Sequence, residues 1–424
     1  MSALNGDAPP ESLKDETKAH FSQQRIGELD GFRAIAVLWV LLLHLCYGWP
    51  PAPPKALSWM PSVLVEVVSH GWLGVDLFFI LSGFLITGIL IDARGTADYF
   101  RNFYARRARR ILPLYLTCIL LMGLAYHGFA GFFGLSLLFL ANFARLFHAR
   151  IPHGPDVLWS LAVEEHFYLL WPLLVRFLTR TFLLVLALVV VFGSPILRGY
   201  CFYRGMDPVR EIYVYTFFRL DGLALGAILA MWVRSRFYNR GSAWKLAGFL
   251  VGFSLLVTVA GVPFGIMQAK TLCSTALRYT QAQFLFAAMI VLALAFRGSP
   301  YTAILRSRFA TRVAGWSYCI YLIHLALGDG YYRVLRAWHF SDVARFGIEG
   351  AVIIRFLAIG GLTFGLAALS KKFLEDPFLR FEPSVAPVPS GRLSRLLPFH
   401  PRSMRPTLQE TSEANSAEKA NRAG

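Results

Sequence analysis

Cysteine is scarce and scattered in this chain of 424 residues. The five cysteines lie far apart, and none belongs to a CxxC motif or to a Cys/His pair with the spacing of a metal site. This pattern argues against a zinc module. We expect no metal site and no permanently bound cofactor, and we interpret the cysteines as packing residues.

Acidic residues are also few, with 25 Asp and Glu against 42 Lys and Arg and a formal net charge of +17. In a soluble chain such an excess would suggest a nucleic-acid partner, but here the basic residues cluster between apolar runs. Basic loops are held on the cytoplasmic side of a membrane. We therefore interpret most of the charge as a topology signal and expect no nucleic-acid partner.

Two further sequence signals are missing. No small-residue cleavage site follows the first apolar run, so we expect this run to be retained as a membrane span and no signal peptide to be removed. No internal repeat is visible, which disfavours a transporter built from duplicated halves.

Apolar residues, in contrast, make up 56% of the chain, and the mean hydropathy is +0.51. Many of the apolar runs are long enough to cross a bilayer, so the sequence predicts an all-α, polytopic helical bundle with about ten spans. The predicted spans are 32–49, 71–91, 111–128, 158–177, 182–198, 213–233, 246–264, 281–297, 313–330 and 349–370. A further apolar stretch, 131–147, is expected to lie in the outer interface or to re-enter the membrane.

The predicted domain organisation is simple. Residues 29–380 form one membrane domain, and the flanking segments 1–28 and 381–424 are polar, without apolar periodicity, and expected to be flexible. The basic loops place both termini in the cytoplasm. The expected location is the inner membrane of a bacterium.

Ionisable residues within the predicted spans point to function, because each costs roughly 2.5 to 3.5 kcal/mol to insert into a membrane. With the deduced topology, five helices place such groups at a similar depth in the outer half of the membrane. We therefore predict a single polar cavity there. Its members are His44, Asp76, Glu164, Arg219, Asp221 and His324.

His44 is the candidate catalytic base. A buried imidazole is often only satisfied by a backbone carbonyl, but near neutral pH a histidine can also accept a proton from a hydroxyl. Asp76 or Glu164 could orient it and stabilise the imidazolium. Arg33 lies eleven positions before His44, so both face the same way about 16 Å apart, as at two ends of an elongated channel.

Two further motifs each allow a functional and a structural interpretation. The run Arg106, Arg107, Arg109 and Arg110 could hold phosphate groups of a donor, or it could only anchor the chain on the cytoplasmic side. Ser82 lies in LSGFL without a GxSxG elbow, so we assign it to the wall of the cavity and not to nucleophilic attack.

Several motifs, in order over about 350 residues, resemble the acyltransferase-3 family of membrane O-acyltransferases. The motifs are LDGFRAIAVLWVLLLH (29–44), GWLGVDLFFILSGFLIT (71–87), FYARRARRILPLY (103–115), LWSLAVEEHFYLLWP (158–172), FFRLDGLALG (217–226), SYCIYLIH (317–324) and EDPF (375–378).

The resemblance implies transfer of an acyl group, commonly acetyl, from cytoplasmic acyl-CoA to a hydroxyl of a cell-envelope or exported glycan. It implies His44 as base, Arg33 as its companion and residues 106–110 as part of the donor site. Glu164 falls on the family's glutamate after WSL. We add Trp159 and Tyr168 of the same motif to the expected substrate cavity.

The sequence departs from the family at His166, where relatives generally have glutamine. Some relatives also carry a C-terminal SGNH-type domain; because only roughly 50 residues follow the last predicted span, we expect no such domain here. The alternative function is a transporter or flippase for a polar envelope intermediate, which would also need a charged cavity. The sequence does not specify the acceptor.

Overall fold

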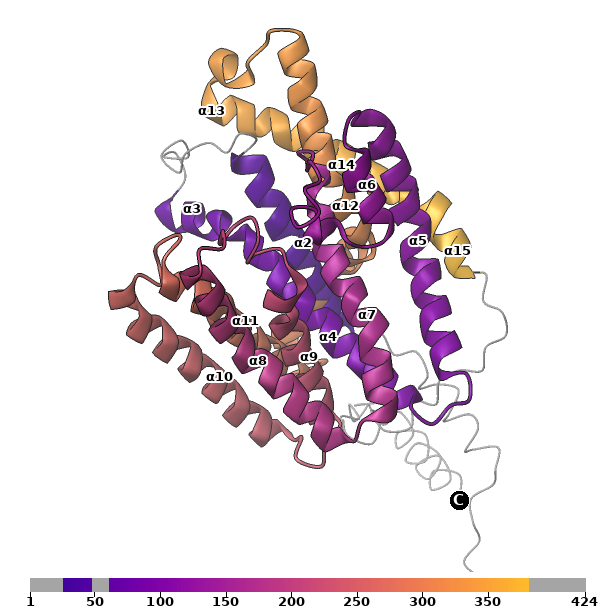
Figure 1. Ribbon diagram of the computed structural model, residues 1–424, viewed down its shortest axis with the longest axis vertical. Helices are drawn as coiled ribbons and strands as arrows, with labels where there is room; N and C mark the ends of the chain where they lie inside the picture. Colours follow the sequence, from indigo (N-terminus) through magenta and orange to yellow (C-terminus); the bar gives the residue numbers. More distant parts are fainter. Residues whose placement is uncertain (1–25, 48–60, 381–424) are drawn as a thin grey trace, which may run out of the picture.

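The computed structural model describes residues 26–47 and 61–380, which are helical with connecting turns and contain no β-strand (Figure 1). The all-α, polytopic fold class is confirmed. The predicted flexible segments fall almost entirely outside the described residues. The long helices are α2 (Gly27–Tyr47), α4 (Gly74–Ala93), α5 (Tyr99–Ala125), α7 (Leu158–Phe177), α8 (Arg180–Tyr203), α9 (Leu220–Val233), α10 (Arg240–Gly261), α11 (Leu272–Ala295) and α12 (Arg308–Ala337).

The described part of the chain ends in α13 (Asp342–Arg355), α14 (Gly361–Ser370) and α15 (Asp376–Arg380), which are joined by two π-helical turns. Seven helical segments among the described residues are long and apolar enough to cross a membrane. The expected number of ten is therefore not confirmed by length and composition. Of the other three helices, α9 has 14 residues and is about 21 Å long, whereas α7 and α12 carry several charged residues.

The ambiguous stretch 131–147 contains no helix of spanning length. It holds α6 (Ala130–Leu137), which has eight residues, and a single 3-10 turn at Ala141–Phe143. A helix of eight residues is about 12 Å long and cannot cross a hydrocarbon core of about 30 Å. The short α3 (Ser62–Ser69), before α4, cannot cross for the same reason.

The arginine run before the third predicted span is helical and not a loop. Helix α5 begins at Tyr99, twelve residues before the predicted start of the span, and its 27 residues make it about 40 Å long. Arginine and alanine both favour helix, so nothing in 101–110 interrupts it. Long arginine side chains can bury their stems and keep their charged ends near water.

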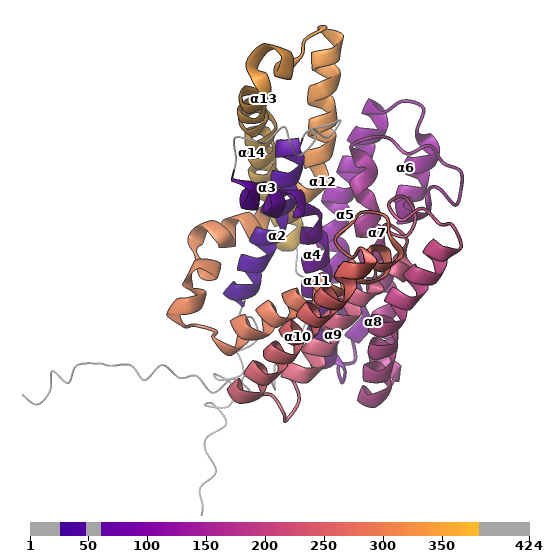
Figure 2. The ribbon, with the colours of Figure 1, turned by 90° about the vertical axis from the view of Figure 1, so that its left-hand side faces the viewer.

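The helices form two groups on either side of α2, α4 and α7 (Figures 1 and 2). In one group α10 packs on α11, α11 on α8, and α8 on α9. In the other α12 packs on α14, and α5 contacts α15 and α12. Helix α4 joins the first group through α9, and α2 joins the second through α12.

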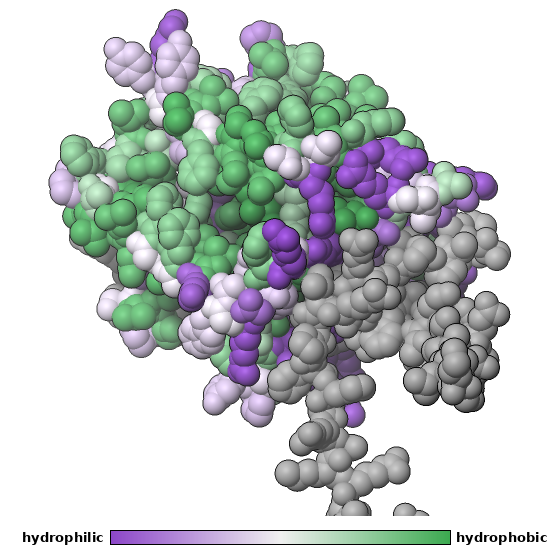
Figure 3. Space-filling model, turned by 90° about the horizontal axis from the view of Figure 1, so that it is seen from below, coloured by the Kyte–Doolittle hydropathy of each residue, from purple (hydrophilic) through white to green (hydrophobic). Residues whose placement is uncertain are grey.

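Much of the surface of the molecule is apolar, as expected for a surface that faces lipid. Seen from below, apolar side chains cover most of the left and upper part of the face, and hydrophilic ones gather on its right-hand side (Figure 3). On α10 the large apolar residues Phe249, Leu255, Leu256 and Val259 are all exposed. In water such a surface would aggregate, so it indicates a lipid-facing helix.

One end of the bundle, here called the basic end, holds several arginines in hydrogen bonds between neighbouring helix ends. Arg234 binds Asp92 through two hydrogen bonds of 2.9 and 2.8 Å, linking α9 to α4. Arg94 donates to the carbonyl of Leu178 at 2.6 Å. The positive-inside rule would place this end in the cytoplasm.

Helices α4 and α9 cross with their backbones in contact at glycine. A Cβ atom at Gly83 would overlap the carbonyl oxygen of Leu223, and one at Gly226 would overlap that of Ile80. Small residues allow such close approach between membrane helices, where packing takes over from the hydrophobic effect.

We expect Gly226→Ala to separate α4 from α9 and to lower the free energy of unfolding by about 1 to 3 kcal/mol. The melting temperature in detergent measures this loss. The matched control is Gly252→Ala in α10, where a Cβ atom would meet nothing within 4 Å. Equal stability of the two variants would contradict the packing argument.

Candidate functional site

A cavity of about 1110 Å³, counted with its open mouth, lies between α2, α4, α5, α7 and α12. We call it the inner cavity. Its polar lining includes Arg33 from α2 and Arg107 and Arg110 from α5. Phe78, Leu85 and Ile86 are among its apolar lining residues. The combination suits an elongated ligand with an anionic end and an apolar arm.

Glu164 is held in the wall of the inner cavity by two hydroxyl groups. The Oγ atom of Ser82 donates to its Oε1 at 2.8 Å, and the hydroxyl of Tyr168 donates to its Oε2 at 3.2 Å. The guanidinium of Arg107 lies over the ring of Tyr168, 5.5 Å from its centroid. Predicted site residues from α4, α5 and α7 therefore meet in one cluster.

His44 pairs with His324 and not with a carboxylate. Its Nδ1 atom lies 2.8 Å from the carbonyl oxygen of Val40 and 3.2 Å from Nε2 of His324. The Nδ1 atom of His324 lies 2.7 Å from the carbonyl oxygen of Tyr321. The expected contact of His44 with Asp76 or Glu164 is not among the hydrogen bonds of the described residues.

These carbonyl groups determine the tautomers, because a carbonyl can only accept. His324 must carry its proton on Nδ1, which leaves its Nε2 as an acceptor. His44 must carry its proton on Nδ1, shared between Val40 and His324. The Nε2 atom of His44 therefore keeps its lone pair, and no described residue forms a hydrogen bond with it. A general base needs such an available lone pair.

A second cavity, the outer cavity, is lined by the histidine pair and encloses about 470 Å³, counted with its open mouth. Its polar lining includes His44, His324, Asp156, Asp329 and Tyr332. The remaining lining residues are Leu41, Leu45, Gly154, Leu325, Gly328 and Ile359.

Tyr321 connects the two cavities. It lines the inner cavity, where its hydroxyl is 2.6 Å from Oγ of Ser160, and its ring lies 5.8 Å from that of His324. The histidine pair and Tyr321 thus stand between the arginine-lined cavity and the outer one. The sequence had singled out neither Tyr321 nor Asp156.

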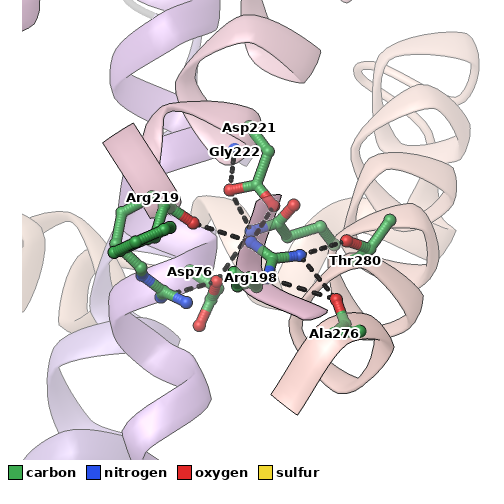
Figure 4. Close-up of polar contacts among 9 residues, drawn as sticks. Asp76, Arg198, Arg219, Asp221, Gly222, Ala276 and Thr280 are labelled. Carbon is green, nitrogen blue, oxygen red and sulfur yellow. Dashed lines mark hydrogen bonds and ion pairs between the residues drawn. The ribbon is translucent and has the colours of Figure 1, made fainter. Parts of the chain in front are cut away.

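Asp76, Arg219 and Asp221 do not line either cavity. They belong to a fully buried polar network between α4, α8, α9 and α11 (Figure 4). Arg219 binds Asp76 at 2.8 Å, and Gln283 donates to both Asp76 and Asp221, at 2.9 and 3.1 Å. Arg198 binds Asp221 at 2.7 Å.

Arg198 completes this network, although the sequence reasoning did not identify it. It also donates to the hydroxyl of Thr280 at 2.6 Å and to the carbonyl oxygens of Phe218 and Ala276, so its guanidinium is well satisfied (Figure 4). Buried charges need such partners, and this network joins four helices. The predicted single polar layer is therefore divided into a cavity group and a separate buried network.

Trp159 lies with this network. Its ring is 4.8 Å from that of Tyr213, and the guanidinium of Arg219 lies 6.0 Å from its centroid and 4.4 Å from that of Tyr279. Aromatic faces attract a cation, so these rings form a cage for Arg219. Neither cavity has Trp159 in its lining.

The arginine run divides in the same way. Arg107 and Arg110 line the inner cavity, whereas the Nε atoms of Arg106 and Arg109 donate to the carbonyl oxygens of Asn102 and Ala105 on their own helix. Only alternate members of the run are therefore placed to meet a ligand in the inner cavity.

His166, where the sequence departs from the family pattern, contacts residues close to it in the fold. Its Nδ1 atom lies 2.7 Å from Oγ1 of Thr216, and its ring stacks on Phe143. Asn142 donates to the same Thr216 oxygen at 2.8 Å. Within residues 26–47 and 61–380 no three His, Cys, Asp or Glu side chains group as metal ligands.

Comparison with known proteins points to the family that the sequence motifs resemble. Residues 26–371 match the acyltransferase-3 family, described as "Acyltransferase domain". Among curated relatives, the putative peptidoglycan O-acetyltransferase YrhL of Bacillus subtilis is 33% identical over 241 residues, which are 51% of this chain and 35% of that protein.

The peptidoglycan O-acetyltransferase OatA of Listeria monocytogenes is 30% identical over 232 residues, 50% of this chain and 34% of that protein. The O-acetyltransferase OatA of Staphylococcus aureus is 30% identical over 236 residues, 50% of this chain and 35% of that protein. The match thus spans about a third of the length of these relatives. No solved structure matches significantly.

Proposed function

Because this chain belongs to the acyltransferase-3 family, we propose that it is a membrane O-acyltransferase that moves an acetyl group from acetyl-CoA to a hydroxyl of a cell-envelope glycan. Relatives named as peptidoglycan O-acetyltransferases support this class of acceptor. The observation that carries the proposal is the Nε2 atom of His44, which has no hydrogen-bond partner among the described residues and lies between an arginine-lined cavity and an outer cavity.

The donor is acyl-CoA, entering at the basic end, which lies in the cytoplasm. Its phosphates bind Arg33, Arg107 and Arg110, because guanidinium groups form charge-assisted hydrogen bonds with phosphate oxygens. The pantetheine arm runs along the apolar wall toward Tyr321 and the histidine pair. The inner membrane of a bacterium supplies both the cytoplasmic donor and access to an acceptor outside.

The reaction is a direct transfer with His44 as general base. The Nε2 atom of His44 takes the proton of the acceptor hydroxyl, whose oxygen attacks the thioester carbonyl carbon. The C–S bond breaks, and the thiolate of CoA leaves with the proton from the imidazolium. The carbonyl of Val40 and Nε2 of His324 stabilise that imidazolium through Nδ1–H. An acyl group carried on His44 is the less favoured route.

The experiment that tests this function supplies acetyl-CoA, labelled in the acetyl group, to membrane vesicles with their basic side accessible, together with envelope glycan. We expect labelled ester on the glycan, detected by mass spectrometry as one added acetyl mass. Glycan movement that needs no acetyl-CoA and adds no mass would support the transporter alternative instead.

We expect Arg110→Gln to raise the KM for acetyl-CoA about tenfold, with little change in kcat, because one charge-assisted contact to a phosphate is lost. The matched control is Arg101→Gln, since Arg101 is exposed on the same helix and lies outside the cavity lining. Kinetics at varied acetyl-CoA measure the effect. An equal KM for the two variants would remove Arg110 from the donor site.

A further inference from the structure

Asp156 places a carboxylate beside the histidine pair, in the outer cavity. It lies in the 3-10 turn Pro155–Val157, immediately before α7. Its Oδ1 atom is buried, and none of the described residues donates a hydrogen bond to it. A carboxylate oxygen can only accept hydrogen bonds, so the missing partner is a donor.

The loop that carries Asp156 is held firmly. Gly154 has φ of +90°, and a Cβ atom there would meet the hydroxyl of Tyr126 at 2.9 Å and the carbonyl oxygen of Leu325 at 3.0 Å. This backbone conformation and close approach both favour glycine. The turn is thus packed against Tyr126, just after α5, and against α12, and Asp156 has a defined position relative to His324.

Asp329, the other carboxylate of the outer cavity, already binds an arginine. Arg333 donates to Asp329 at 2.6 Å and lies over the ring of Tyr126, 4.0 Å from its centroid. Among the described residues no arginine lines the outer cavity, and the charged group that lowers the pKa of Asp156 is His153. The cavity has two carboxylates, one of them bound to arginine, and it disfavours an anionic group.

We propose that the outer cavity is the acceptor subsite and that Asp156 accepts a hydrogen bond from a hydroxyl of an uncharged sugar ring. This orients the ring so that the hydroxyl to be acylated meets Nε2 of His44. The inference rests on the proposed acyltransferase function and adds how the acceptor is recognised.

The test is Asp156→Asn in the full chain in membrane vesicles, with acetyl-CoA and a neutral N-acetylglucosamine oligosaccharide as acceptor. We expect the KM for the oligosaccharide to rise about 10- to 100-fold, because a hydrogen bond to a charged group is weakened. The KM for acetyl-CoA should stay unchanged. Asp156→Glu should recover part of the acceptor affinity.

The matched control is Asp98→Asn, which changes an exposed aspartate away from both cavities. The amount of protein and its melting temperature report on folding of each variant. If the wild type acetylates the oligosaccharide but Asp156→Asn leaves the acceptor KM within twofold, Asp156 holds only water and the inference is wrong. If the wild type transfers no acetyl group to any glycan, the proposed function itself fails.

The pH dependence gives a second readout. Burial raises the pKa of Asp156 to about 6, so its carboxylate becomes neutral as the pH falls through that value. The acceptor KM of the wild type should therefore rise below about pH 6, and that of Asp156→Asn should not. A parallel rise in both would assign the titration to another group. The charged and titratable groups around this carboxylate are His153, Asp329, Arg333, Tyr126, Tyr332, His44 and His324.

Discussion

Replacing His44 with alanine is expected to lower acetyl transfer by about 10²- to 10⁴-fold, the range that a general base contributes. The variant loses Nε2 of His44, whose lone pair is available to take a proton. It also loses the Nδ1–H contacts to Val40 and His324 that would stabilise the resulting imidazolium. His44 is only partly buried, so its truncation leaves most of the packing of α2 in place. Labelled acetyl transfer in vesicles, corrected for the amount of folded protein, measures the loss.

Two substitutions of His324 test how much its hydrogen bond to His44 contributes to the transfer rate. His324→Gln keeps an acceptor oxygen within reach of the Nδ1–H of His44, whereas His324→Ala removes the acceptor. We expect the alanine variant to be slower than the glutamine variant, and both to be faster than His44→Ala. Full activity of His44→Ala would rule out His44 as the base, and equal activity of both His324 variants would remove the hydrogen bond from the mechanism.

The second large effect concerns stability. Arg219→Met is expected to lower the free energy of unfolding by about 3 to 5 kcal/mol, because it leaves Asp76 buried without its cation. The melting temperature in detergent and the yield of folded protein measure this cost. The matched control is Arg204→Met, since Arg204 is exposed and its hydrogen bond to Tyr200 links only neighbouring turns.

The double variant Arg219→Met with Asp76→Leu should regain much of that stability, because neither charge then remains uncompensated. Comparison of the single and double variants also distinguishes a role of Asp76 in folding from a role in the reaction. A stable double variant that still transfers acetyl groups assigns Asp76 to folding. A stable double variant without transfer would restore the expectation that Asp76 serves the reaction.

The sequence predicted a depth in the membrane for each of these polar groups, but it could not predict on which side of each helix they meet. Counting residues from the span ends gives depth, and His44, Asp76 and Glu164 do come from three packed helices. Which side chains meet depends on helix rotation and on neighbours far apart in sequence, such as Gln283 for Asp76. One predicted cavity therefore became two cavities and a buried network.

Residues outside the predicted pattern were missed for identifiable reasons. Asp156 precedes the predicted fourth span by two residues, so it was counted as loop and not as part of the site. The sequence HGPD offered a signal, since glycine and proline before an acidic residue favour a fixed turn at the start of a helix. Arg198 lay at the end of a predicted span, where an arginine is ordinarily taken for an anchor.

The histidine pair and Tyr321 also have a consequence for the membrane as an electrical insulator. Two water-accessible cavities that met freely would form a conducting path for protons and ions across the membrane. Tyr321, hydrogen-bonded to Ser160 at 2.6 Å, lines the inner cavity, and His324, packed against His44, lines the outer one. In the proposed reaction these side chains separate the donor from the acceptor, so an acyl group passes from one cavity to the other while the membrane potential is maintained.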